Sequence, residues 1–128
     1  MSEQKINLDK IEVLVSKEYF VNYLRQRLNP YLLNSNLPIT AFYKGFVLVL
    51  NYMLGLQVKF ASDFNKVPLR NVIIAIEALH WDLQLDKIKA IYINLTENSS
   101  LSFYDPELAR GARECLETLL NLNNSNKD

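Results

Sequence analysis

The sequence contains few of the residues from which most catalytic and metal sites are built. Among its 128 residues there are one cysteine, one histidine and three glycines. A serine or cysteine nucleophile needs a positioned base, a zinc site needs several Cys or His ligands, and a phosphate-binding loop needs clustered glycines. The sequence supplies none of these sets, so we expect a protein that is not an enzyme and that binds no metal or cofactor.

The lone cysteine and the lone histidine have ordinary structural interpretations. Cys115 lies on the apolar side of the predicted last helix, where a small buried side chain is expected. A single cysteine forms no internal disulfide, which favours a reducing, cytoplasmic setting. His80 falls at the edge of another predicted helix and is interpreted as a core-edge residue with a hydrogen-bonded ring.

The chain also lacks net charge, because 14 basic residues balance 14 acidic ones. Proteins that hold nucleic acid through its phosphates carry an excess of Lys and Arg. The balance therefore argues against nucleic acid as the main partner, although a local basic patch remains compatible with it. Low net charge also leaves self-association unopposed, which is compatible with a homodimer.

No hydrophobic run is long enough to span a membrane. The uncharged run from Gly45 to Val58 is bounded by Lys44 and Lys59, and a spanning helix needs about 20 residues. We interpret this run as a core helix. No secretory signal is visible among the charged residues at the start of the chain.

What is present resembles an average globular domain, with 49% hydrophobic and 22% charged residues. The length suits a single domain. We predict one domain over residues 1–128, ordered from about residue 6 to residue 122 between short polar termini.

The first half of the chain is predicted to be helical. Apolar spacing favours a helix over Leu8–Leu28 that ends at Asn29-Pro30. Alternation within residues 11–15 leaves open a short strand followed by a helix capped by Ser16. A central helix is predicted over Pro38–Leu54, although residues 45–50 would also suit a buried strand.

The second half is predicted to mix helices and strands. A helix beginning at Val67-Pro68-Leu69 is expected to run to Asp82. Lys87–Leu95, rich in β-branched residues, predicts a strand that pairs with Leu101–Tyr104 in a hairpin.

A last helix is predicted to begin at Asp105-Pro106-Glu107. Its solvated side would carry ion pairs of Arg110 with Glu114 and of Arg113 with Glu117. Together the elements predict an α+β fold, a helix-rich single domain with a small antiparallel β-hairpin or sheet packed against the helices.

Residues 60–72 suggest an alternative function. They read as a helix, a turn and a second helix, which resembles the helix-turn-helix of winged-helix DNA-binding regulators. The resemblance implies a helix-turn-helix around residues 60–80, with the predicted hairpin as the wing. The second helix offers Arg70 and Asn71 and is then apolar, whereas base recognition needs polar side chains.

Aromatic content favours a protein partner. Aromatic residues make up 11% of the chain, and Tyr and Trp are enriched among interface hot spots. We therefore predict a non-catalytic adaptor, assembly factor or chaperone-like module that binds a protein or peptide in an aromatic groove between the hairpin and the neighbouring helices. The residues predicted to line this groove are Phe42, Tyr43, Trp81, Tyr92 and Tyr104.

Overall fold

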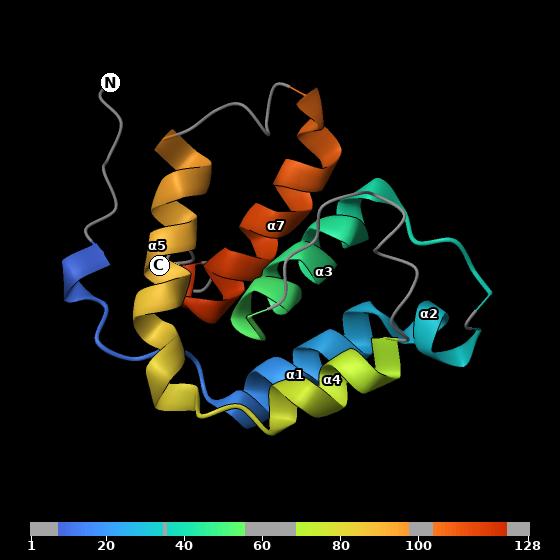
Figure 1. The fold of residues 1–128 in the computed structure, drawn as a ribbon, viewed down its shortest axis with the longest axis horizontal. Helices are drawn as coiled ribbons and strands as arrows, with labels where there is room; N and C mark the ends of the chain where they lie inside the picture. The colour runs from blue at the N-terminus through green and yellow to red at the C-terminus, as the bar shows by residue number, and fades with distance from the viewer. Residues whose placement is uncertain (1–7, 35, 56–68, 98–103, 123–128) are drawn as a thin grey trace.

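The computed structural model describes residues 8–34, 36–55, 69–97 and 104–122. All regular structure within these ranges is helical (Figure 1), so the predicted α+β fold is wrong. The elements in chain order are η1 (Leu8–Lys10), α1 (Lys17–Arg27), α2 (Asn29–Leu33), α3 (Ala41–Met53), α4 (Leu69–Glu77), η3 (Trp81–Leu83), α5 (Gln84–Glu97) and α7 (Pro106–Leu119), where η marks a short 3-10 helix.

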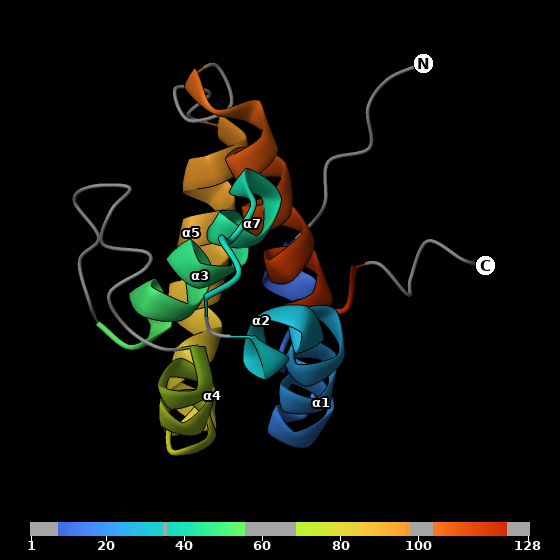
Figure 2. The ribbon, with the colours of Figure 1, turned by 90° about the vertical axis from the view of Figure 1, so that its right-hand side faces the viewer.

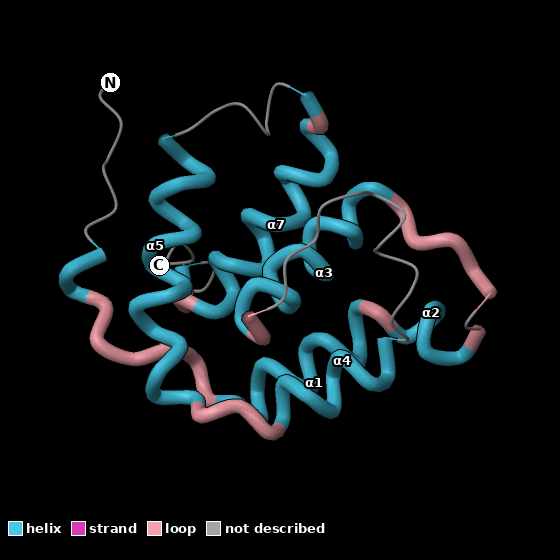
Figure 3. The backbone as a smooth tube through the Cα atoms, in the orientation of Figure 1, coloured by secondary structure: helices cyan, strands magenta, loops and turns pink. Residues whose placement is uncertain are grey.

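The helices pack around one shared core. Helices α3 and α7 cross in the middle of the molecule, and α5 packs against both (Figure 1). Helices α1 and α4 lie side by side and run in opposite directions beneath them (Figures 1 and 2). Figure 3 draws the same backbone as a tube, in which the described residues are helix or loop. None of the helices in the described ranges is both long enough and apolar enough to cross a membrane.

The predicted strand Lys87–Leu95 lies within helix α5. Ile88 and Tyr92, four residues apart, are buried, whereas Ile93 is 42% exposed. This is the spacing of one helical face. The predicted turn begins inside α5, and of the predicted partner strand only Tyr104 falls within the described residues. The hairpin prediction is therefore wrong at its first strand.

The first predicted helix is shorter than expected. Residues 11–16 form neither helix nor strand, and α1 begins after Ser16, whose Oγ accepts a hydrogen bond from the backbone N–H of Tyr19 (3.1 Å). One continuous helix over Leu8–Leu28 is therefore wrong, whereas the alternative cap at Ser16 is confirmed. The break at Asn29-Pro30 is also confirmed, and Pro30 stands in the first turn of α2.

The central and last helices are confirmed. Residues 45–50 lie inside α3, so the strand alternative for them is wrong. The Thr40 side chain caps the start of α3, and Gly55 follows its end with a φ of 78°. In α7 the Asp105 side chain caps the start through the N–H of Leu108. The pair Arg113–Glu117 is present (3.8 Å).

The helix predicted from Val67 to Asp82 ends earlier than expected. Its first two residues lie outside the described ranges, and α4 stops at Glu77. A polar contact closes this end, since Lys17 Nζ donates to the carbonyl oxygens of Glu77 (2.7 Å) and Leu79 (2.6 Å). A lysine at a helix C-terminus satisfies carbonyls that have no partner within the helix.

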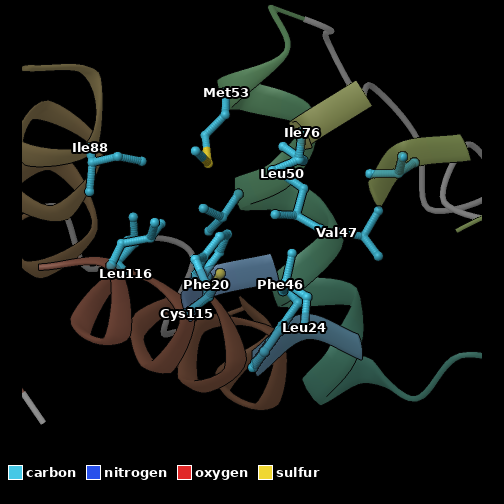
Figure 4. Packing of buried hydrophobic residues seen from close by; sticks show 14 of the residues in the cluster. Phe20, Leu24, Phe46, Val47, Leu50, Met53, Ile76, Ile88, Cys115 and Leu116 are labelled. Atoms are coloured by element: carbon cyan, nitrogen blue, oxygen red, sulfur yellow. The ribbon is translucent and has the colours of Figure 1, made fainter. Parts of the chain in front are cut away.

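The core is formed by aliphatic and aromatic side chains from every long helix (Figure 4). Phe20 and Leu24 of α1 and Phe46 and Leu50 of α3 are fully enclosed. Cys115 of α7 lies among them, as expected for a small apolar side chain.

Candidate functional site

An aromatic cluster with an arginine at its centre lies where the end of α1, α2 and the start of α3 meet. We call it the arginine–aromatic cluster. Its rings follow one another at centroid distances of 5.8 Å from Tyr31 to Tyr43, 5.2 Å from Tyr43 to Phe46 and 6.0 Å from Phe46 to Tyr23. Its members are Tyr23, Arg27, Tyr31, Phe42, Tyr43 and Phe46.

Local helix geometry explains why these side chains meet. Tyr23 and Arg27 are four residues apart on α1, and Phe42 and Phe46 are four apart on α3, so each pair shares a helical face. Phe42 and Tyr43 lie edge to face, with centroids 5.0 Å apart and planes at 86°. Such T-shaped contacts stabilise aromatic pairs beyond the burial of their area.

Arg27 connects the rings. Its Cζ lies 5.6 to 6.0 Å from the centroids of Tyr23, Phe42, Tyr43 and Phe46. Its guanidinium donates to the hydroxyl oxygens of Tyr43 (3.3 Å) and Tyr23 (3.4 Å). A planar guanidinium stacks on rings and donates in the plane at the same time, which a lysine ammonium does not do.

A carboxylate from α7 completes the polar part of the cluster. Glu114 forms an ion pair with Arg27 and accepts a hydrogen bond from the hydroxyl of Tyr23 (2.9 Å). The side chains of Arg27 and Glu114 are only 35% and 29% exposed. Burial first, and Glu114 in addition, raises the pKa of Tyr23 well above its ordinary value, which keeps this phenol neutral and donating.

Arg110 forms the outer edge of the cluster. Its Cζ lies 4.5 Å above the centroid of the Phe42 ring, and its Nη2 is 2.8 Å from Oε1 of Glu107. Sequence spacing predicted a pair with Glu114, but Glu114 is engaged by Arg27, and Arg110 pairs one turn back instead. The side chains of Arg110 and Glu107 are both exposed.

Two of the five predicted groove residues belong to this cluster. Phe42 and Tyr43 are half-buried, so each ring packs on its neighbours and also reaches solvent. Their position beside Arg27 and Arg110 was not predicted. The sequence signal that could have predicted the involvement of Arg27 is its i,i+4 spacing from Tyr23 on α1.

The other three predicted residues lie elsewhere. Trp81 packs against Phe20 (5.9 Å between centroids), and its Nε1 donates to the carbonyl oxygen of Val15 (2.8 Å). Tyr92 is buried in the core, with its hydroxyl 3.3 Å from Oε2 of Glu117. Tyr104 is 81% exposed beside the start of α7. The structure therefore does not gather the five residues into one groove.

The candidate chemical residues are also accounted for. Cys115 is enclosed, and burial raises the pKa of its thiol, which disfavours the reactive thiolate. His80 is exposed at the start of η3. Within the described residues, no three Asp, Glu, His or Cys side chains are grouped to hold a metal ion.

The helix-turn-helix around residues 60–80 stays a prediction. Residues 60–68, which contain its first helix and its turn, lie outside the described ranges. The residues predicted to begin its wing, from Ile91 to Leu95, are helical in α5.

The arginine–aromatic cluster is thus the most developed polar and aromatic arrangement among the described residues. Tyrosine and arginine are the side chains most enriched where proteins hold one another. Comparison of the sequence and fold with protein-family models, curated proteins and solved structures finds no match.

Proposed function

We propose that this protein is a non-catalytic protein-interaction module of the cytoplasm, acting as an adaptor, assembly factor or chaperone-like protein. The observation that carries the proposal is the arginine–aromatic cluster. It presents half-buried Tyr31, Phe42 and Tyr43 beside the exposed guanidinium of Arg110. Aromatic and arginine side chains of this kind dominate the binding energy of protein interfaces.

The cluster is fixed before any partner arrives. Tyr43 contacts three other rings and receives the Arg27 guanidinium, and the Tyr31 hydroxyl oxygen accepts from the backbone N–H of Thr40 (3.4 Å). Rings that are already held lose little rotamer entropy on binding. A pre-organised aromatic surface therefore favours a stable interface.

The outer layer adds polar recognition. Arg110 offers a planar guanidinium of which one face covers Phe42, while its edge has donors beyond those used by Glu107. A carbonyl or carboxylate oxygen of a partner would accept hydrogen bonds from these remaining N–H groups. The combination of an apolar ring and an exposed fork of donors resembles the anchor sites of protein interfaces.

Site-specific photo-crosslinking in the native cell tests the proposal. A benzophenone amino acid placed at the exposed position Glu107, which lies beside Arg110 and leaves that side chain in place, should yield a discrete covalent adduct with one protein. The same probe placed at Asp86, an exposed position on α5, is the matched control. We expect the adduct at position 107 alone, and its loss when Phe42→Ala is added to the probe-bearing chain. Identical adducts at both positions, or none at position 107, would contradict the proposal.

Phe42→Ala needs its own folding control, because the ring also packs on Phe46. Circular dichroism and urea unfolding of the variant separate loss of the surface from loss of the fold. Arg110→Ala supplies a second route, since its exposed side chain can be removed with little effect on stability. An adduct that persists at a probe on neighbouring Glu107 in the Arg110→Ala variant would also contradict the proposal.

A further inference from the structure

The hydroxyl groups of Tyr31 and Tyr43 act only as hydrogen-bond acceptors within the described part of the chain. The Tyr43 oxygen accepts from Nε of Arg27 (3.3 Å), and the Tyr31 oxygen accepts from the backbone N–H of Thr40 (3.4 Å). A phenol can accept and donate at the same time. Among the described residues neither of these two donates to a protein acceptor, so both O–H groups can donate to a partner.

The carboxylates beside these rings are already engaged. Glu114 accepts from the hydroxyl of Tyr23 and forms an ion pair with Arg27. Glu107 accepts from Nε (3.4 Å) and Nη2 (2.8 Å) of Arg110, which leaves the Nη1 donors to other acceptors. Both arginines of the cluster therefore have their charge balanced. What the cluster offers to a partner is aromatic surface together with hydrogen-bond donors.

We propose that this cluster binds a proline-rich segment of the partner protein in the polyproline II conformation. Proline has a carbonyl acceptor but no backbone N–H, and a polyproline II helix uses none of its carbonyls internally. Such a segment brings the acceptors that the hydroxyls of Tyr31 and Tyr43 need, and it requires few acceptors in return. The inference rests on the proposed function and names the chemistry of the partner.

The rings supply the apolar part of this contact. Tyr31, Tyr43 and Phe42 are half-buried and follow one another at centroid distances of 5.8 and 5.0 Å. Their planes meet at 64° and 86°, so successive rings present faces and edges in different directions. Proline-rich segments dock among aromatic side chains. Because the segment and the rings are both ordered before they meet, binding costs little conformational entropy.

Hydrogen-bond complementarity disfavours other occupants. A helix pairs its backbone carbonyls internally, so its backbone would leave both phenols without an acceptor. An ordinary extended segment brings an N–H with every carbonyl, and the carboxylates of Glu107 and Glu114 are engaged. Nucleic acid stacks on rings, but its phosphates draw their affinity from cations, and the cluster's arginines are paired.

Selection from a phage-displayed library of random dodecamer peptides on the full chain tests this inference. We expect the selected peptides to be enriched in proline. By fluorescence anisotropy, a labelled copy of the most frequent peptide should bind the double variant Tyr31→Phe, Tyr43→Phe about tenfold more weakly, because this variant keeps both rings and loses both donors. The matched control is Tyr19→Phe with Tyr52→Phe, which removes two hydroxyls from exposed tyrosines outside the cluster and should leave the affinity unchanged.

A second measurement changes the peptide and so does not depend on the stability of any variant. Replacing the prolines of the selected peptide with alanine adds backbone N–H donors and releases the polyproline II conformation. The replaced peptide should bind the unchanged protein about tenfold more weakly. Circular dichroism and urea unfolding establish that both double variants are folded.

The outcomes separate this inference from the proposed function. Selected peptides without proline, or a peptide that binds both double variants equally, overturn the proline-rich partner while leaving a protein-interaction module in place. A library that yields no specific peptide also overturns it, whereas the crosslinking at Glu107 still decides the proposed function. Tighter binding of a labelled single-stranded oligothymidine than of the selected peptide, lost in Phe42→Ala, overturns the inference in favour of nucleic acid.

Discussion

Gly45 of α3 and Gly111 of α7 lie at the point where the two helices cross, each against the backbone of the other helix. A Cβ added to Gly111 would stand 1.7 Å from the carbonyl oxygen of Phe42, and one added to Gly45 would stand 2.2 Å from that of Leu108. The same crossing brings Arg110, the residue before Gly111, over the ring of Phe42. The contact of Arg110 with Phe42 at the outer edge of the arginine–aromatic cluster therefore depends on two glycines, which have no Cβ and let the helices approach closely.

Replacing either glycine at the crossing with alanine should separate the helices. The atoms in the way are backbone, which does not move aside as a flexible side chain does, so we expect Gly111→Ala to lower the free energy of unfolding by about 3 kcal/mol. Urea unfolding followed by circular dichroism measures this. Arg110 should also become more accessible to guanidine-directed labelling.

Gly55→Ala is the matched control for this prediction. An added Cβ meets nothing within 4 Å there, but the φ of +78° strains an L-residue. The expected loss is about 1 kcal/mol, from backbone strain alone. Equal losses at Gly55 and Gly111 would show that the crossing is looser than its geometry indicates.

The close crossing could not be predicted from the sequence, because a glycine has no side chain whose type indicates which distant helix it contacts. Gly45 and Gly111 are far apart in the chain, and each lies in the interior of its own helix. The caps are different, since Ser16, Thr40 and Asp105 act on backbone groups three residues away. Signals that act locally were readable, and Asp105-Pro106 predicted the start of α7 correctly.

Helix α5 allows a direct test of the corrected fold. Ile88 is fully buried, whereas Ile93 is 42% exposed. We expect Ile88→Ala to destabilise the protein by about 3 kcal/mol and Ile93→Ala by less than about 1 kcal/mol. Chemical denaturation of both variants provides the measurement. Comparable losses would contradict the observed burial of the Ile88 face, and amide hydrogen exchange along Gln84–Glu97 separates a helix from a strand, because the two states protect different amides.

The strand interpretation of this segment failed for a physical reason. Ile and Tyr favour strands, but their intrinsic disadvantage in a helix is well below 1 kcal/mol per residue. The same residues place Ile88, Ile91, Tyr92 and Leu95 on one helical face. Packing of that face against α7 and α3 decides the outcome, and a single sequence does not show those partners.

Only part of the candidate site could be predicted from the sequence, for a similar reason. Aromatic content pointed to Phe42 and Tyr43, whereas Arg27 and Arg110 come from other helices and reach the same rings only in the folded chain. Tyr92 and Trp81 show the converse, because both make contacts inside the protein. Tyr92 is buried in the core, and the indole N–H of Trp81 donates to the carbonyl oxygen of Val15. Residue type indicates capacity for binding, and tertiary packing decides which rings retain it.

Arg27 and Arg25 offer matched ion pairs for a third prediction. Double-mutant cycles of Arg27→Met with Glu114→Gln, and of Arg25→Met with Glu77→Gln, measure each coupling energy by urea unfolding. The Arg27–Glu114 pair is shielded by rings, so we expect a coupling of about 1 to 2 kcal/mol. The exposed Arg25–Glu77 pair should give less than about 0.5 kcal/mol. Equal couplings would show that the aromatic surroundings do not strengthen the charge pair.

Arg27→Lys extends this test to geometry. Lysine keeps the charge but loses the planar fork that donates to Tyr23 and Tyr43. We expect the variant to lose at least half of the stability lost by Arg27→Met. Arg25→Lys, in the exposed pair, should be almost neutral. A fully tolerated Arg27→Lys would mean that charge alone holds the cluster together.

A buried thiol and a largely buried phenol make the free energy of unfolding depend on pH in the alkaline range. Burial raises the pKa of the Cys115 thiol above its ordinary value of 9.0, and burial with Glu114 raises that of Tyr23 above 10.0. Both groups therefore keep their protons in the folded protein at a pH where the unfolded chain loses them. Because the folded state then binds more protons than the unfolded state, the free energy of unfolding must fall as pH rises.

We accordingly expect stability to decline above about pH 9 as the unfolded thiol ionises, and more steeply above about pH 10 as the tyrosine follows, by about 1.4 kcal/mol per pH unit for each group. Urea unfolding from pH 7 to 11 under reducing conditions measures the slope. Cys115→Ala should remove the decline between pH 9 and 10, and Tyr23→Phe should flatten the curve above pH 10. The exposed Tyr19→Phe is the control. Slopes unchanged in both variants would place the alkaline sensitivity elsewhere in the protein.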